Sequence, residues 1–99
     1  MLEQFRECLS KEGRSGNTIN SYCYAAGNYM KWYRETYGQE MGRLYRSNVL
    51  DYIAYLRTVK KLSNRSVNAK LAALQALNQF LVESGRQEEL VLSRKDYLK

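Results

Sequence analysis

Two segments of the chain concentrate small hydrogen-bonding side chains where a helix is expected to begin. One is residues 15–22, Ser-Gly-Asn-Thr-Ile-Asn-Ser-Tyr, and the other is residues 62–70, Leu-Ser-Asn-Arg-Ser-Val-Asn-Ala-Lys. The first turn of a helix exposes backbone N–H groups and carries partial positive charge, so it favours anions such as phosphate. Ser, Thr, Asn, Arg and Lys add side-chain donors. The chemistry that these residue types support is therefore phosphate binding.

Ordinary helix capping is the alternative explanation for part of this pattern. A helix needs one capping side chain, and Asn17 and Ser63 suit that role as well as they suit phosphate. Arg65, Asn68 and Lys70 lie within the same two turns and exceed what a cap requires. The phosphate interpretation therefore depends mainly on these three residues.

The sequence contains no histidine, which removes several classes of enzyme. Ser-His and Cys-His nucleophilic centres and every histidine general base are excluded. Residues 13–16, Gly-Arg-Ser-Gly, lack the spacing and the lysine of a phosphate-binding P-loop. Cys8 and Cys23 cannot complete an ordinary zinc site without histidine, and we interpret both as free thiols. We expect no cofactor, no metal and no catalytic residue in this chain.

The charge balance favours an anionic partner. Sixteen Lys and Arg residues oppose 10 Asp and Glu, for a formal net charge of +6, and the surplus lies in the middle of the chain. No apolar run approaches the roughly 20 residues that span a bilayer. We therefore expect no membrane partner and a cytoplasmic location.

Apolar residues repeat at three- and four-residue steps, which predicts helices and no strands. The expected helices span residues 2–12, 17–38, 48–61 and 62–85. The second has Ser15 or Asn17 as its cap, and the fourth begins at Leu62 or Ser63 and stops at Gly85. Residues 1–85 would form one helical domain, and residues 86–99 would form a short helix around Leu90 and Val91 followed by a linker.

The third predicted helix has Ser47 or Asn48 as its cap. Asn48 and Asp51 have the spacing of a capping box, and Lys60 and Lys61 would close the helix at the negative end of its dipole. Its core stripe is expected to contain the following residues: Leu50, Ile53, Leu56 and Val59.

Most of the nine tyrosines are expected in the core. Tyr24 differs, because the helical projection places it on a polar face beside Ser21 and Lys31. We expect Tyr24 to reach a partner.

Four motifs in order resemble one known family. They are Ser-x-x-Thr-Ile-x-x-Tyr at 15–22, Val-Leu-x-Tyr-Ile-x-Tyr-Leu at 49–56, Ser-x-x-Ser-Val-Asn-x-Lys-Leu-x-Ala-Leu at 63–74, and the helix end at 80–85. This order is similar to the core-binding domain of tyrosine recombinases, the phage-integrase enzymes, and the likeness extends from about Phe5 to Gly85.

The resemblance implies an all-α fold: a four- to five-helix orthogonal bundle of two crossed helical hairpins, described as SAM-like. It further implies a DNA-binding module that forms half of a clamp, with double-stranded DNA and other recombinase protomers in a synaptic complex as partners. Catalysis would belong to a separate domain with two arginines, a histidine-bearing box and a nucleophilic tyrosine. Family members often end this module with Asn-Pro, whereas Gly85 is followed here by Arg-Gln-Glu-Glu.

In this family the second and fourth helices face the major groove and bind mainly phosphates. Carried over to this chain, the resemblance implies these DNA-binding residues: Asn17, Thr18, Ser21, Tyr24 and Lys31 on the second helix, and Ser63, Asn64, Arg65, Ser66, Asn68 and Lys70 on the fourth.

Two other functions fit an all-helical basic chain. One is a protein–protein interaction or oligomerisation module that uses the alanine-rich face of the fourth helix. The other, a freestanding helix-turn-helix repressor, is disfavoured because no pair of helices with a three- to four-residue turn is evident.

Overall fold

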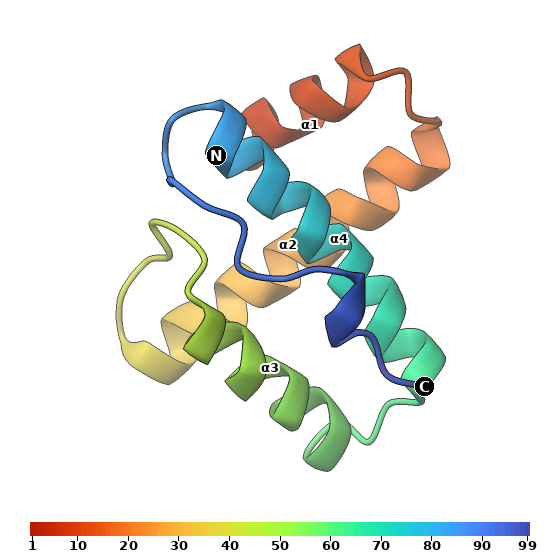
Figure 1. Cartoon of the computed structure of the whole chain (residues 1–99), viewed down its shortest axis with the longest axis vertical. Coiled ribbons are helices and arrows are strands. Elements are labelled where there is room, and N and C mark those ends of the chain that lie inside the picture. The colour runs from red at the N-terminus through yellow and green to blue at the C-terminus, as the bar shows by residue number, and fades with distance from the viewer.

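Four α-helices and a C-terminal tail make up the computed structural model, which describes residues 1–99 (Figure 1). The elements are α1 (Leu2–Lys11), α2 (Gly16–Tyr37), α3 (Arg46–Thr58), α4 (Asn64–Glu83) and a single 3₁₀ turn, η1 (Arg94–Asp96). No strand is present, so the all-α prediction is confirmed. None of the helices combines the length and the apolar character needed to cross a bilayer.

Serine caps determine where α2 and α4 begin. Ser15 Oγ accepts a hydrogen bond from the Thr18 N–H at 3.2 Å, and Ser63 Oγ accepts one from the Ser66 N–H at 3.2 Å. Each bond satisfies one of the N–H groups that have no partner inside the helix. At the other end, Gly38 stops α2 with φ 74°, a left-handed conformation that costs glycine little. Of the two caps predicted for α2, Ser15 is therefore the one used.

The prediction for α3 is wrong at its start. The helix begins at Arg46 with Tyr45 as the capping residue, and no side chain bonds the first turn. This places Asn48 inside the helix, where it cannot act as a cap, so the Asn48–Asp51 capping box does not form. Asp51 instead accepts a 2.9 Å hydrogen bond from the hydroxyl of Tyr37 on α2.

The core face of α3 also differs from the predicted stripe. Leu50 is 46% exposed and Val59 is 66% exposed, although both were expected to be buried. The buried residues are Val49, Tyr52, Ile53 and Leu56. These positions follow the i, i+3, i+4, i+7 spacing of one helical face. Tyr52 therefore takes the core position that Leu50 was expected to occupy.

The bundle consists of two hairpins, α1–α2 and α3–α4, which meet where α4 crosses α2 (Figure 1). Ala26 of α2 and Ala73 of α4 are fully buried, and their small side chains allow the helices to approach closely. Aliphatic side chains fill the core around this crossing, among them Leu71, Leu74, Leu77 and Leu81 of α4.

An aromatic cluster fills the space between the C-terminal half of α2 and α3. The centroid of the Tyr52 ring lies 5.0 Å from that of Tyr29 and 4.9 Å from that of Trp32. Trp32 also packs edge-on against Tyr37. Tyr33 and Tyr52 are buried, as is Tyr29, and Tyr22, Tyr37 and Tyr55 are partly buried against the core, so the expectation that most tyrosines are structural is confirmed.

The tail runs back along α4 in the opposite direction (Figure 1). Asn78 accepts a 2.7 Å hydrogen bond from the Val91 N–H and donates a 3.3 Å bond to the Glu89 carbonyl. Asn68 does the same for Leu98, accepting from its N–H and donating to its carbonyl, each at 2.7 Å. Two asparagines of α4 therefore hold the tail by its peptide groups.

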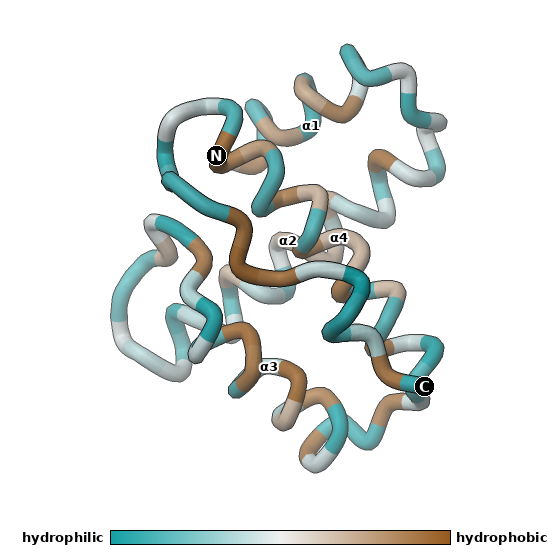
Figure 2. The backbone as a smooth tube through the Cα atoms, viewed as in Figure 1, coloured by the Kyte–Doolittle hydropathy of each residue, from teal (hydrophilic) through white to brown (hydrophobic).

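No helix forms around Leu90 and Val91, where the sequence predicted one. Residues 90–92, Leu-Val-Leu, are instead a non-helical apolar stretch that crosses the body of the molecule (Figure 2), and Leu92 is buried. Gln87 is buried as well, and its amide bonds both the N–H and the carbonyl of Leu44, at 3.0 and 2.9 Å. The only helical turn of the tail comes later, at Arg94–Asp96.

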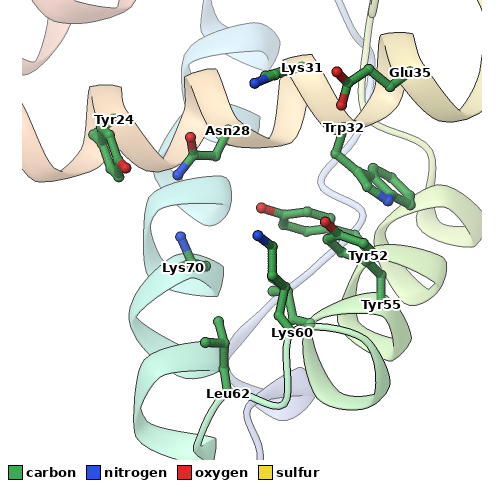
Figure 3. Close-up of a pocket in the computed structure, with 11 residues that line it drawn as sticks. Tyr24, Asn28, Lys31, Trp32, Glu35, Tyr52, Tyr55, Lys60, Leu62 and Lys70 are labelled. Carbon is green, nitrogen blue, oxygen red and sulfur yellow. The ribbon is translucent and has the colours of Figure 1, made fainter.

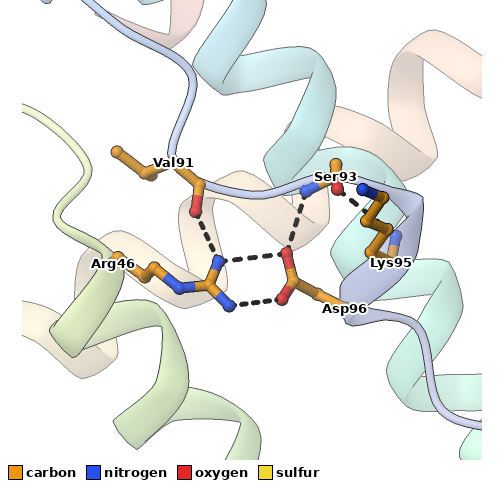
Figure 4. A network of polar contacts seen from close by, with 5 residues as sticks. All are labelled: Arg46, Val91, Ser93, Lys95 and Asp96. Carbon is orange, nitrogen blue, oxygen red and sulfur yellow. Dashed lines mark hydrogen bonds and ion pairs between the residues drawn. The ribbon is translucent and has the colours of Figure 1, made fainter.

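Arg46 at the start of α3 secures this turn (Figure 4). Its guanidinium donates to the Val91 carbonyl at 2.9 Å and to both carboxylate oxygens of Asp96, at 2.8 and 3.2 Å. Asp96 also accepts from the Ser93 N–H at 2.9 Å. These bonds, those of Arg46 above all, hold the pKa of the Asp96 carboxyl below its ordinary value.

A pair of leucine substitutions tests the packing. Leu74→Ala removes a fully buried side chain and should lower the free energy of unfolding by about 2–5 kcal/mol, measured by urea denaturation. The matched Leu50→Ala removes the same atoms from an exposed site and should change it by about 0.5 kcal/mol or less. Equal losses in the two variants would contradict the assignment of the α3 core face.

Acid should loosen the tail. Because folding lowers the pKa of Asp96, its stabilising contribution is fully present above the ordinary aspartate pKa of about 3.9 and is lost as the pH falls through the lower, folded-state pKa. Amide hydrogen exchange at Ser93, corrected for its intrinsic pH dependence, should accelerate below about pH 4. Asp96→Asn should exchange quickly at neutral pH and show no such acid response, and an acid response equal to that of the wild type would contradict this role.

Candidate nucleic-acid interface

One face of α2 presents a row of polar side chains. Asn17, Ser21, Tyr24, Asn28 and Lys31 follow one another at three- and four-residue steps, so they share one side of the helix. Tyr24 is 72% exposed, the largest exposure of any big apolar or aromatic side chain in the chain. Thr18 is half-buried, and its Oγ accepts a 3.0 Å hydrogen bond from the Ser15 hydroxyl. Four of the five predicted residues of this helix therefore lie on an exposed ridge, and Thr18 belongs to the cap.

The predicted residues of α4 divide into three groups. Ser63 and Ser66 form the cap, with their hydroxyls 3.1 Å apart. Asn64 and Asn68 bond the tail, Asn64 through a 2.7 Å bond to the Lys99 carbonyl. Arg65 is exposed and Lys70 is half-buried, and five helical positions place them about 140° apart around the axis. Only Arg65 and Lys70 are thus engaged by neither the cap nor the tail.

The helix starts that carry these residues do not meet. Figure 1 shows α2 beginning beside the end of α1 and α4 beginning at the other end of the molecule, beside the chain terminus. What the fold brings together is the middle of α2 and the second turn of α4. The two helix starts are therefore separate in space, and most of the residues predicted on them are exposed.

A cleft of about 400 Å³ lies where these elements meet (Figure 3). Lys31 reaches it from α2, Lys60 from the connection between α3 and α4, and Lys70 from α4. Tyr24 and Asn28 line its α2 side, and Glu35 is its only acidic residue. Three ammonium groups against one carboxylate leave the cleft with an excess of positive charge.

Aromatic rings form the deeper wall of this cleft. Trp32, Tyr52 and Tyr55 line it, and the ring centroids of Tyr52 and Tyr55 lie 6.1 Å apart in nearly parallel planes. Burial raises the pKa of Tyr52 to about 12. Its hydroxyl therefore stays protonated at neutral pH and remains a hydrogen-bond donor.

Sequence reasoning missed two parts of this arrangement. Lys60 was interpreted only as a helix-closing charge, because the sequence does not reveal that the α3–α4 connection folds toward α2. The tail-binding role of Asn64 and Asn68 did leave a signal. Asn64, Asn68, Gln75 and Asn78 share one face of α4, and Gln75 accepts a 3.0 Å bond from the Tyr97 hydroxyl, so this amide row faces the tail along its length.

The rest of the surface offers little metal or thiol chemistry. No three His, Cys, Asp or Glu side chains gather closely enough to hold a metal ion. Both cysteines are free, Cys23 buried and Cys8 half-buried, and burial together with Glu12 raises the pKa of the Cys8 thiol. A raised pKa makes this thiol a weaker nucleophile at neutral pH.

Comparisons with known proteins show the family to which the chain is similar. Residues 2–85 match the family described as "Phage integrase, N-terminal SAM-like domain". The chain is 36% identical over 99 residues to the TnP I resolvase of Bacillus thuringiensis, covering all of the chain and 35% of the resolvase. It is 34% identical over 80 residues to the tyrosine recombinase XerA of Thermococcus kodakarensis, covering 81% of the chain and 25% of that recombinase.

No solved structure matches the chain significantly. The chain spans about a third of the length of the resolvase and a quarter of that of the recombinase. The family match nevertheless extends from the start of α1 to the glycine after α4, and thus over all four helices of the bundle. The chain therefore belongs to the family of N-terminal SAM-like domains of phage integrases.

Proposed function

We propose that this chain is the DNA-binding module of a tyrosine recombinase, and that it grips duplex DNA through the phosphate backbone. The observation that carries the proposal is the positively charged cleft in which the middle of the α2 ridge meets Lys60 and Lys70, with Arg65 exposed separately on the first turn of α4. Phosphate contacts fix the register and orientation of a protein on DNA without reading its sequence. The module thus supplies affinity and position.

In this proposal the chemistry belongs to another part of a longer protein. The two relatives named above are called a resolvase and a recombinase, and each is much longer than the part that matches. The chain itself carries no catalytic centre, and residues 86–99 lead toward the catalytic domain. Further recombinase protomers are partners in the synaptic complex. A partner that is DNA also places the protein in the cytoplasm.

The proposal assigns unequal roles to the predicted DNA-binding residues. Asn17, Ser21, Tyr24 and Lys31 on α2 and Arg65 and Lys70 on α4 have side chains with no partner in the chain, whereas the Ser66 hydroxyl accepts a bond from Ser63 in the cap. Asn64 and Asn68 are engaged with the tail, and DNA would have to displace residues 98 and 99 to reach them. We therefore assign phosphate contacts to the first group only.

Salt dependence tests whether the partner is the DNA backbone. A module that neutralises about three to five phosphates should lose affinity with a log–log salt slope of about −3 to −5, from a nonspecific dissociation constant of about 10⁻⁴ to 10⁻⁶ M. Fluorescence anisotropy of a labelled duplex measures both values. Affinity independent of salt would contradict the proposal. Absence of a DNA complex together with concentration-dependent self-association would favour an oligomerisation module instead.

Two matched double variants test where the DNA lies. Arg65→Ala with Lys70→Ala should weaken duplex binding and reduce the salt slope by about 2, with little change in melting temperature. Arg57→Ala with Lys11→Ala removes the same two side chains from exposed positions on α3 and α1. This control should retain most of the affinity. An unchanged affinity of the first variant would overturn the site assignment.

A further inference from the structure

Most of the residues that line the cleft between α2 and α4 carry a side-chain hydrogen-bond donor. Eight of its 11 residues carry an N–H or O–H group: Tyr24, Asn28, Lys31, Trp32, Tyr52, Tyr55, Lys60 and Lys70. None of these side chains bonds to another group of the chain. Figure 3 shows Asn28 and Trp32 of α2 directed toward the space that Lys60 and Lys70 enter, with Lys31 along the edge of α2.

The opposite flank of α4 shows what a satisfied polar surface looks like in the same molecule. There Asn64, Asn68, Gln75 and Asn78 all have partners in the tail. Asn68 and Lys70 are separated by about 160° around the helix axis, so the two surfaces lie on opposite sides. One side of α4 is thus occupied by the chain itself, whereas the donors on the other side have no partner in the chain.

The backbone that carries Lys60 is held in a defined position. Its N–H donates to the Tyr55 carbonyl at 3.1 Å, and the Leu62 N–H donates to the Leu56 carbonyl at 3.0 Å. Between them Lys61 adopts φ 54°, the only left-handed residue in the chain that is not glycine. A residue other than glycine is strained in this conformation, and such strain is found at functional sites. The strained turn reverses the chain so that Lys60 faces α2.

We propose that this cleft binds a backbone phosphate of the DNA and that Lys60 is one of its ligands. The inference rests on the proposed function, because it takes DNA as the partner. Lys31, Lys60 and Lys70 approach from three separate elements, which suits the several oxygens of one phosphodiester group. The hydroxyls of Tyr52 and Tyr55 and the amide of Asn28 add neutral donors.

A phosphate in this position would tie the two hairpins together. Lys31 belongs to the α1–α2 hairpin, whereas Lys60 and Lys70 belong to the α3–α4 hairpin. The aromatic wall excludes water from one side of the cleft, and a less solvated surrounding strengthens each charge-assisted hydrogen bond. Lys60 would therefore contribute more to affinity than an equally exposed lysine elsewhere.

Neighbouring lysines provide a matched pair of variants. Lys60→Ala should weaken binding of the full chain to a short mixed-sequence duplex and reduce the log–log salt slope by about 1. Lys61→Asn removes the same charge one residue away, outside the cleft lining, and asparagine tolerates the left-handed conformation. This control should keep the wild-type slope. Equal slopes for the two variants would overturn the assignment of Lys60.

The single tryptophan of the sequence gives an independent readout, because Trp32 lines the cleft. Adding duplex DNA to the wild-type chain should change Trp32 emission, and high salt should reverse the change. If DNA binds but the emission never responds, the phosphate does not enter the cleft, and the proposed function survives without this inference. If no DNA binds at any salt concentration, the proposed function itself fails.

Discussion

The packing of α4 across α2 is the contact on which the other elements depend. α1 and α3 also pack on α4, and the tail bonds along it, so this one helix has three different environments around its axis. Leucines 71, 74, 77 and 81 face the core, an amide row faces the tail, and the flank that carries Lys70 stays open. Burial of aliphatic surface holds the helix in place, and that position determines which polar side is left for a partner.

Helical periodicity explains why much of the bundle could be predicted from the sequence. Ser15 and Gly38 form hydrogen bonds within one turn of the ends of α2, so these helix ends can be predicted from the neighbouring sequence. The apolar face of α4 can be predicted from the sequence in the same way, and so can the exposure of Tyr24 on the polar face of α2. A single face of a single helix is a local property, and it is encoded by residues three and four positions apart.

The sequence-based predictions fail where contacts between distant segments determine the structure. The core face of α3 is chosen by the aromatic cluster of α2, which accommodates Tyr52 and leaves Leu50 in solvent. The tail lacks the periodicity of a helix, and its conformation depends on Arg46 and on asparagines of α4 that are 11 to 35 residues away in sequence. The lysine cleft likewise arises only from the crossing of the two hairpins. No local pattern predicts that Lys31, Lys60 and Lys70 line one space.

Two of the asparagines that hold the tail also set a distance. Asn68 and Asn78 are ten residues apart, which corresponds to about 15 Å along a helix. Their partners Val91 and Leu98 are seven residues apart, and a fully extended chain of that length would reach about 23 Å. The 3₁₀ turn at Arg94–Asp96 takes up this difference, with Arg46 bracing it. Residues 91–98 therefore act as a spacer whose length matches about three turns of α4. Inserting or deleting one residue in this segment would lower the stability of the fold more than most substitutions of exposed side chains.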